Sequence, residues 1–199
     1  MCRTPDAPTM TIAATPATFQ ERAATYMLAR AHGEYTEFDI REIILPSYID
    51  LAELLGLDPV LAVVQLIHET GNLTSWWSAR PRRNPAGIGV TGRKEVQRPA
   101  AGSWQQNPSG EWAEGVAFEN WTVQAIPAHV GRLLAYALTD DQASQRQRKV
   151  IQEALAFRPL PAKYRGCART WRGLNGTWAN PGRTYADKLA EIARAINHP

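Results

Sequence analysis

The sequence predicts a mainly α domain that carries a small β-hairpin lobe. Helical periodicity covers most of the chain, and the stretch 60–67 is apolar on nearly all sides. Residues 72–116 interrupt this pattern with many glycines, prolines and tryptophans, and short stretches there favour strands. A chain of 199 residues can bury a core of its own. We therefore expect one domain over 18–199, behind a flexible leader, 1–17, that is rich in Pro, Thr and Ala.

Capping and breaking signals divide the first part of the chain into helices. Thr18 and Glu21 have the spacing of a capping box, and Gly33 lies where the helix that follows would end. The stretch 39–55 is amphipathic but contains Pro46. We therefore expect one short helix before this proline and another after it.

The next helix is expected to be central. Asp58 is a good N-cap, and Pro59 suits the first helical position. The run 60–67 has no polar face of the kind that a surface helix shows, so neighbours should surround it. The helix carries Glu69 near its end and stops at Gly71.

Short strands and further helices follow. The stretches 89–93 and 114–118 are expected to pair in the β lobe. Helical stripes return from residue 122, near 148–157 and over 185–196. The sequence thus predicts a helical body with an extended lobe inserted after the central helix.

Composition excludes several classes of function. The net charge is +3 and the pI about 9.0, a modest excess without any recognisable nucleic-acid-binding module, so no nucleic acid is expected. Cys2 and Cys167 have neither disulfide nor metal-ligand spacing. No apolar run approaches the roughly 18 residues of a membrane span, and no ordinary signal peptide is seen. We expect a monomer that needs no metal and no organic cofactor.

Glu69 is the main candidate for chemistry. A carboxylate at the end of an apolar helix is costly to bury unless it is protonated or paired. Gln65 lies one turn earlier and could bond to it, the helix end carries partial negative charge, and Trp76 could help exclude water. All three effects favour the protonated form that a glycosidase acid must hold near neutral pH. The alternative is a carboxylate that simply emerges at the surface.

The pair His68-Glu69 also raises the possibility of a zinc peptidase. That motif needs a second histidine one helical turn beyond the first, and here Asn72 occupies the position. The sequence therefore argues against a zinc site, and we expect His68 to lie behind the site or at the surface.

Two further features suit a sugar polymer. The segment 84–92 contains three glycines, which let the backbone approach a ligand closely. Flat aromatic rings stack on apolar sugar faces, and five of the seven tryptophans lie in or near the irregular region: Trp76, Trp77, Trp104, Trp112 and Trp121. The alternatives are a plain glycine-rich turn and rings that fill the core, and we favour the core for Trp121 and Trp178.

Four motifs, in order, carry a resemblance to a known family. They are Gln65-Leu66-Ile67-His68-Glu69-Thr70-Gly71, Asn84-Pro85-Ala86-Gly87-Ile88-Gly89-Val90, Phe118-Glu119-Asn120-Trp121, and Trp178-Ala179-Asn180-Pro181 followed by Tyr185. Over about 57–196 the chain resembles the bacterial endo-β-N-acetylglucosaminidase domain of autolysins and flagellar peptidoglycan hydrolases, glycoside hydrolase family 73 and its relatives.

The resemblance implies a lysozyme-like helical domain that cleaves the β-1,4 bond after N-acetylglucosamine in peptidoglycan. It implies that Glu69 is the general acid and that Tyr185 faces the active site. The residues expected at the substrate are Gln65, Trp76, Asn84, Gly87, Ile88, Gly89 and Tyr185. Such an enzyme would act at the cell wall or outside the cell, by an export route that the sequence leaves open.

The second catalytic group is less defined. Some members of the family have another acidic residue in the β lobe, and here the lobe offers Glu95, Glu111 and Glu114. We favour Glu95 or Glu111, since an inverting enzyme needs two carboxyls about 6.5–9.5 Å apart. If none of the three reaches, the N-acetyl group of the substrate is expected to act as the nucleophile.

Rival functions remain at this point. A muramidase or a lytic transglycosylase could use one glutamate on the same fold. A wall-binding module without activity is a rival from another class.

Overall fold

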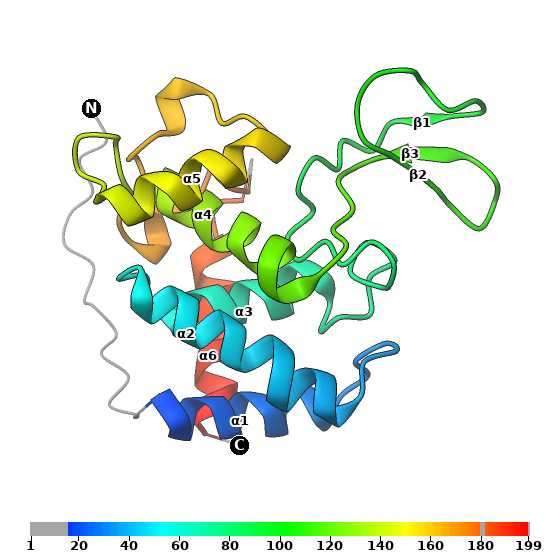
Figure 1. Ribbon diagram of the computed structural model, residues 1–199. Helices are drawn as coiled ribbons and strands as arrows, with labels where there is room; N and C mark the ends of the chain where they lie inside the picture. The colour runs from blue at the N-terminus through cyan, green and yellow to red at the C-terminus, as the bar shows by residue number, and fades with distance from the viewer. Residues whose placement is uncertain (1–15, 180–181, 199) are drawn as a thin grey trace.

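The structure is a computed structural model that describes residues 16–179 and 182–198. This part of the chain contains six α-helices and one three-stranded antiparallel sheet, so the predicted mainly α fold with a small β lobe is confirmed. The helices form one body around α3, and the sheet projects from one side of it (Figure 1). The helices are α1 (Pro16–Leu28), α2 (Leu45–Leu54), α3 (Pro59–Thr70), α4 (Ile126–Ala137), α5 (Gln145–Phe157) and α6 (Tyr185–Asn197).

The central helix α3 forms as the sequence predicts. The Asp58 carboxylate accepts hydrogen bonds from the backbone N–H of Val60 (2.9 Å) and of Leu61 (3.4 Å), which caps the N-terminus. Every residue from Leu61 to Ile67 is buried. Gly71 ends the helix in the left-handed conformation, with φ at +56°. Because α3 is enclosed, its last turn has a fixed place in the molecule.

Pro46 does not break the helix that contains it. A π-helical turn, η1 (Asp39–Ile44), continues directly into α2, and Pro46 lies in the first turn of α2, just after the helix changes type. In place of the expected break, the helix changes from π to α between Ile44 and Leu45. The first helix also starts earlier than expected, at Pro16, and it ends at Leu28, before Gly33.

The β lobe has three strands. β1 (Lys94–Glu95) and β2 (Trp104–Gln106) both pair with β3 (Trp112–Glu114), which lies between them. The expected strand over 89–93 does not form, because Gly89 and Gly92 have φ values of +72° and +80° that turn the chain. The strand expected over 114–118 is found at 112–114 instead.

The remaining helices complete the body. A second π-helical turn, η2 (Trp121–Ala125), leads into α4, and α4 packs on α5 with Gly131 against the backbone of Val150. The helical stripe expected near 148–157 is a helix that begins at Gln145, behind a capping box of Ser144 and Gln147. Two 3₁₀ turns, η3 (Ala162–Tyr164) and η4 (Trp171–Leu174), precede α6. None of the helices in the described ranges is long and apolar enough to cross a membrane.

Candidate active site

Glu69 lies half-buried in the last turn of α3, and two donors from the C-terminal part of the chain reach it. The indole N–H of Trp178 donates to Glu69 Oε1 at 3.0 Å, and the hydroxyl of Tyr185 donates to the same oxygen. Within the described residues, Oε2 makes no hydrogen bond. One oxygen of the carboxyl group is thus anchored to the protein, while the other remains available for a proton or a ligand.

A chain of buried hydrogen bonds continues inward from Tyr185. Gln65 Nε2 donates to the Tyr185 hydroxyl at 2.7 Å, and Gln65 Oε1 lies 2.9 Å from His129 Nε2. His129 Nδ1 lies 2.9 Å from the hydroxyl of Tyr48. Gln65, His129 and Tyr48 are all fully buried. We call Tyr48, His129, Gln65 and Tyr185 the relay. Gln65 therefore reaches Glu69 through Tyr185, where the sequence predicted a direct bond.

The chemistry of Glu69 gives this relay one direction. Oε1 of Glu69 accepts hydrogen bonds whether or not Oε2 carries a proton, so Tyr185 donates to Oε1 and accepts from the amide nitrogen of Gln65. The amide oxygen of Gln65 then faces His129, whose Nε2 must carry the hydrogen. His129 Nδ1 is left to accept from Tyr48. Every proton of the relay thus points toward Glu69.

The four side chains of the relay are neutral. Burial lowers the pKa of His129 to about 3, with a smaller contribution from Arg132. Burial also raises the pKa of Tyr185, and the Glu69 carboxylate beside it adds to this effect. His129 is therefore a neutral imidazole and Tyr185 a neutral phenol near neutral pH. The relay orients Tyr185, and it supplies no charge of its own.

Trp178 has a different place from the one we expected. The sequence favoured a core position, but the ring is only half-buried and its N–H is used on Glu69. The ring packs on His129 and on Tyr136, with centroids 5.8 Å and 5.4 Å apart. Trp121 does lie in the core, at 5% exposure. Asn180 and Pro181, which follow Trp178 in the fourth motif, lie outside the described residues.

A left-handed turn holds the end of α3 in place. Gly71, Asn72 and Leu73 all have positive φ values, between +56° and +67°, which is costly for the two residues that carry side chains. The Asn72 amide donates to the backbone carbonyls of Met27 and Ala31 in and after α1. His68 packs edge-on against the Tyr185 ring at 5.4 Å. These contacts hold the end of α3 against α1 and α6.

Asn84 organises the glycine-rich segment from within. Its side chain is 1% exposed; the amide nitrogen donates to the carbonyls of Ile88 and Val116, and the amide oxygen accepts from the N–H of Ala86 and of Ile88. All four hydrogen-bonding positions of the side chain are used on the backbone. Ile88 is also buried, at 3% exposure, whereas Gly87 is exposed. Asn84 therefore shapes the segment, and Gly87 presents its backbone at the surface.

Trp76 is half-buried, and its ring is partly covered. The guanidinium of Arg82 lies over the ring at 3.9 Å from the centroid, and Trp77 packs against it edge-on at 4.7 Å. Trp77 in turn touches the backbone of Gly115, where an added Cβ would lie 2.4 Å from the ring. The tryptophan pair thus joins the end of α3 to the base of the β lobe.

The three lobe carboxylates occupy different places. Glu111 lies at the turn between β2 and β3, bonded to Asn107 and Lys94, and these contacts lower the pKa of its carboxyl. Glu95 pairs with Arg93 at 3.2 Å. Glu114 ends β3 next to Gly115, at the base of the lobe.

Glu114 is also the most enclosed and best positioned of the three. Its side chain is 20% exposed, against 44% for Glu95 and 41% for Glu111. The Thr91 hydroxyl donates to it at 2.6 Å. With a rise of about 3.3 Å per strand residue, Glu111 lies about 10 Å farther out along β3. Glu114 is therefore the lobe carboxylate closest to the helical body along the sheet.

Comparison with known proteins finds similarity among solved structures alone. No family model and no curated protein matches this chain. Among solved structures, the catalytic domain of the autolysin Auto from Listeria monocytogenes is similar to it, at 19% sequence identity and a TM-score of 0.47. The similarity covers 94% of this chain and 89% of that one. We therefore argue function from the geometry around Glu69.

Proposed function

We propose that this protein is a peptidoglycan hydrolase, a glycosidase that cleaves the β-1,4 bond after N-acetylglucosamine with Glu69 as general acid. The observation that carries the proposal is the asymmetry of the Glu69 carboxyl group. Oε1 accepts from Tyr185 and Trp178, whereas Oε2 makes no hydrogen bond in the described part of the chain. A general acid needs one oxygen free to carry the proton to the leaving group.

The two donors also suit the reaction's change of charge. As Oε2 gives its proton to the glycosidic oxygen, the C1–O bond breaks and negative charge develops on Glu69. Tyr185 and Trp178 already point at Oε1, so they stabilise this charge without reorganising. The relay behind Tyr185 keeps its hydroxyl oriented as a donor. After it has given up its proton, the Glu69 carboxylate remains in place until it is protonated again for the next turnover.

Glu114 is our candidate for the second carboxylate. Sequence alone favoured Glu95 or Glu111. Arg93 lies near both Glu95 (3.2 Å) and Glu114 (3.8 Å), but the Glu114 side chain is the least exposed of the three lobe carboxylates. Glu114 lies at the base of the lobe, fixed by Thr91. In the proposal, Glu114 activates the water that attacks C1 on the face opposite to Glu69.

The glycan would be held by the segment and rings between the two carboxylates. The exposed backbone at Gly87 offers N–H and C=O groups to acetamido and hydroxyl groups of the sugar. Asn84 supports this backbone from inside through its hydrogen bonds to Ile88. In the proposal, Gly89 adds partly exposed backbone and Trp76 offers a ring to a sugar face. Such a protein would act at the bacterial cell wall.

Mass spectrometry of digested peptidoglycan tests this function. Hydrolysis after N-acetylglucosamine yields fragments with that sugar at a reducing end. A muramidase would leave N-acetylmuramic acid there instead, and a lytic transglycosylase would leave anhydro ends. Wall binding without any fragments would favour the non-catalytic module.

A further inference from the structure

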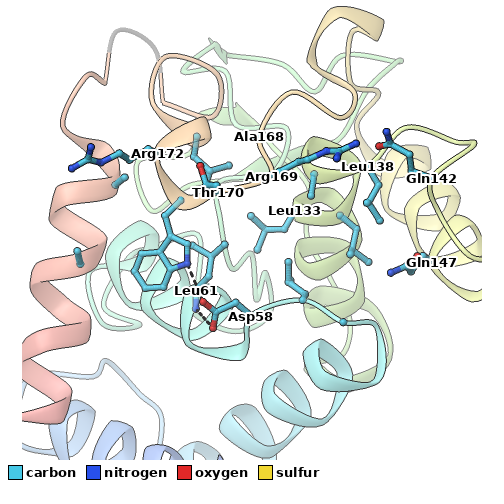
Figure 2. A pocket seen from close by; sticks show the side chains of 18 of the residues that line it. Asp58, Leu61, Leu133, Leu138, Gln142, Gln147, Ala168, Arg169, Thr170 and Arg172 are labelled. Atoms are coloured by element: carbon cyan, nitrogen blue, oxygen red, sulfur yellow. Dashed lines mark hydrogen bonds between the residues drawn. The ribbon is translucent and has the colours of Figure 1, made fainter. Parts of the chain in front are cut away.

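A cavity of about 710 Å³ lies at the other end of α3 from Glu69. It opens between the N-terminus of α3, the second half of α4, the turn η4 and one side of α6 from Ala186 to Arg194 (Figure 2). Neither Glu69 nor any member of the relay lines it. Along α3, Asp58 and Glu69 are about 16 Å apart at 1.5 Å per residue. The cavity is therefore separate from the proposed glycan site.

The floor and one wall of the cavity are apolar. Leu61, Leu133, Leu134 and Leu174 contribute to the lining, and each is at most 7% exposed to solvent. The Trp171 indole N–H donates to Asp58 at 3.0 Å, which closes one side (Figure 2). A concave space of a few hundred Å³ with an apolar lining is typical of small-molecule sites.

The rim is polar and carries more positive than negative charge. Arg169, Arg172 and Arg194 all line the cavity, and none of them forms an ion pair within residues 16–179 and 182–198. The acidic side chains in the lining are Asp58 and Asp187, and Asp58 is already bonded to Trp171 and to the start of α3.

Arg169 is the cation best placed for a ligand. In Figure 2 its side chain lies along the rim toward Leu138 and Gln142, whereas Arg172 extends the other way. Asp141, outside the lining, feels the charge of Arg169, which contributes to lowering the pKa of Asp141 after hydrogen bonds from Thr139 and its own backbone. No ion pair joins the two side chains in the described residues, so the guanidinium can still bind an anion.

We propose that this cavity binds a single-chain amphiphile, with its alkyl chain on the leucine floor and its anionic head, a carboxylate or a phosphate, at Arg169. An apolar body and one anionic end match the lining and the rim. The site stands independently of the proposed hydrolase activity. None of the four relay side chains lines the cavity, although Ala186, which follows Tyr185 on α6, does.

Calorimetric titration of the whole chain tests the proposal. The probes are decanoate and decyl phosphate below their micelle concentrations and 1-decanol below its solubility limit. We expect one saturable site, with at least one anionic probe binding about threefold tighter than decanol, the gain of an exposed ion pair. R169A should remove that preference. R146A is the matched control, because Arg146 is exposed, lies outside the cavity and should leave the preference unchanged.

A cavity-filling variant tests where the chain binds. Ala190 lines the cavity from α6, so A190F should weaken binding of all three probes by more than about tenfold. Thermal unfolding followed by circular dichroism establishes that the variant folds, and A137L on α4 replaces it if it does not. Absence of saturable binding, equal affinity for decanol and both anions, or binding that survives the filled cavity would overturn the proposal.

Discussion

The hydroxyl of Tyr185 donates a hydrogen bond to Oε1 of Glu69, although the two residues are 116 positions apart in the sequence. Tyr185 is the first residue of α6 and Glu69 belongs to the last turn of α3, so the bond ties two helices at the candidate site. Gln65 donates to the same hydroxyl. The position and direction of the Glu69 side chain thus depend on a neutral network that the rest of the fold keeps in place.

Removing the Tyr185 hydroxyl should affect both activity and stability. In Y185F, Glu69 loses a donor and the buried amide of Gln65 loses its acceptor. We expect wall digestion to slow by about tenfold or more, and the free energy of unfolding to fall by about 1–3 kcal/mol. Turbidity assays and urea unfolding measure the two effects. Y26F is the control, because the Tyr26 hydroxyl makes no hydrogen bond in the described residues; equal behaviour of the two variants would contradict the role of Tyr185.

The buried His129 predicts how stability depends on pH. Its pKa is about 3 in the folded protein and about 6.5 when unfolded, so below pH 6.5 only the unfolded chain takes up a proton at this position. The contribution of His129 to the free energy of unfolding should therefore be fully present above pH 6.5. It should fall as the pH drops toward 3, by up to about 1.4 kcal/mol per pH unit.

Replacing His129 isolates this effect. H129N retains a polar side chain but does not titrate, so its free energy of unfolding should change less between pH 7 and pH 4 than that of wild type. Urea unfolding at several pH values gives both curves. Parallel curves would mean that His129 is accessible to protons in the folded state.

The lobe carboxylates can be ranked by substitution. Since Glu114 lies at the base of the lobe and Glu111 at its outer turn, E114Q should slow wall digestion by about 100-fold or more, and E111Q by less than about threefold. E95Q should resemble E111Q. The opposite ranking would assign the role of second catalytic carboxylate to Glu95 or Glu111, which the sequence favoured. If none of the three has an effect, the N-acetyl group of the substrate would be the nucleophile.

Gly131 allows a test of the helical body apart from the site. A Cβ at this position would lie 2.5 Å from the carbonyl oxygen of Val150 and 2.7 Å from the Cβ of Ala154, so α4 and α5 would have to separate. We expect G131A to lower the free energy of unfolding by about 1–3 kcal/mol, despite the better helix propensity of alanine. A stabilised G131A protein would show that the two helices are farther apart.

Local signals predicted α3 well, and non-local contacts explain what the sequence missed. Asp58, Pro59 and Gly71 define the ends of α3 through their own backbone preferences, which need no partner elsewhere. His129 could not be assigned to the site, because its partner Gln65 is 64 residues away and no spacing rule joins them.

The positions of Trp178 and of the strands also could not be predicted from local sequence signals. The sequence contains no sign that the Trp178 indole would reach Glu69 across 109 residues, so a core position was the simpler expectation. The prediction of a strand over 89–93 was wrong. The glycines of this segment, which suggested close approach to a ligand, have positive φ values that turn the chain. Propensity alone does not separate these two uses of glycine.

The most direct test of the account is digestion of purified peptidoglycan by wild type and by E69Q. The amide keeps the shape of the side chain but has no proton to give, so we predict that clearing falls by about 100- to 10,000-fold while wall binding persists. E53Q, which changes an exposed glutamate on α2, should clear walls like wild type. Clearing by E69Q at the wild-type rate would contradict the role of Glu69 as the acid.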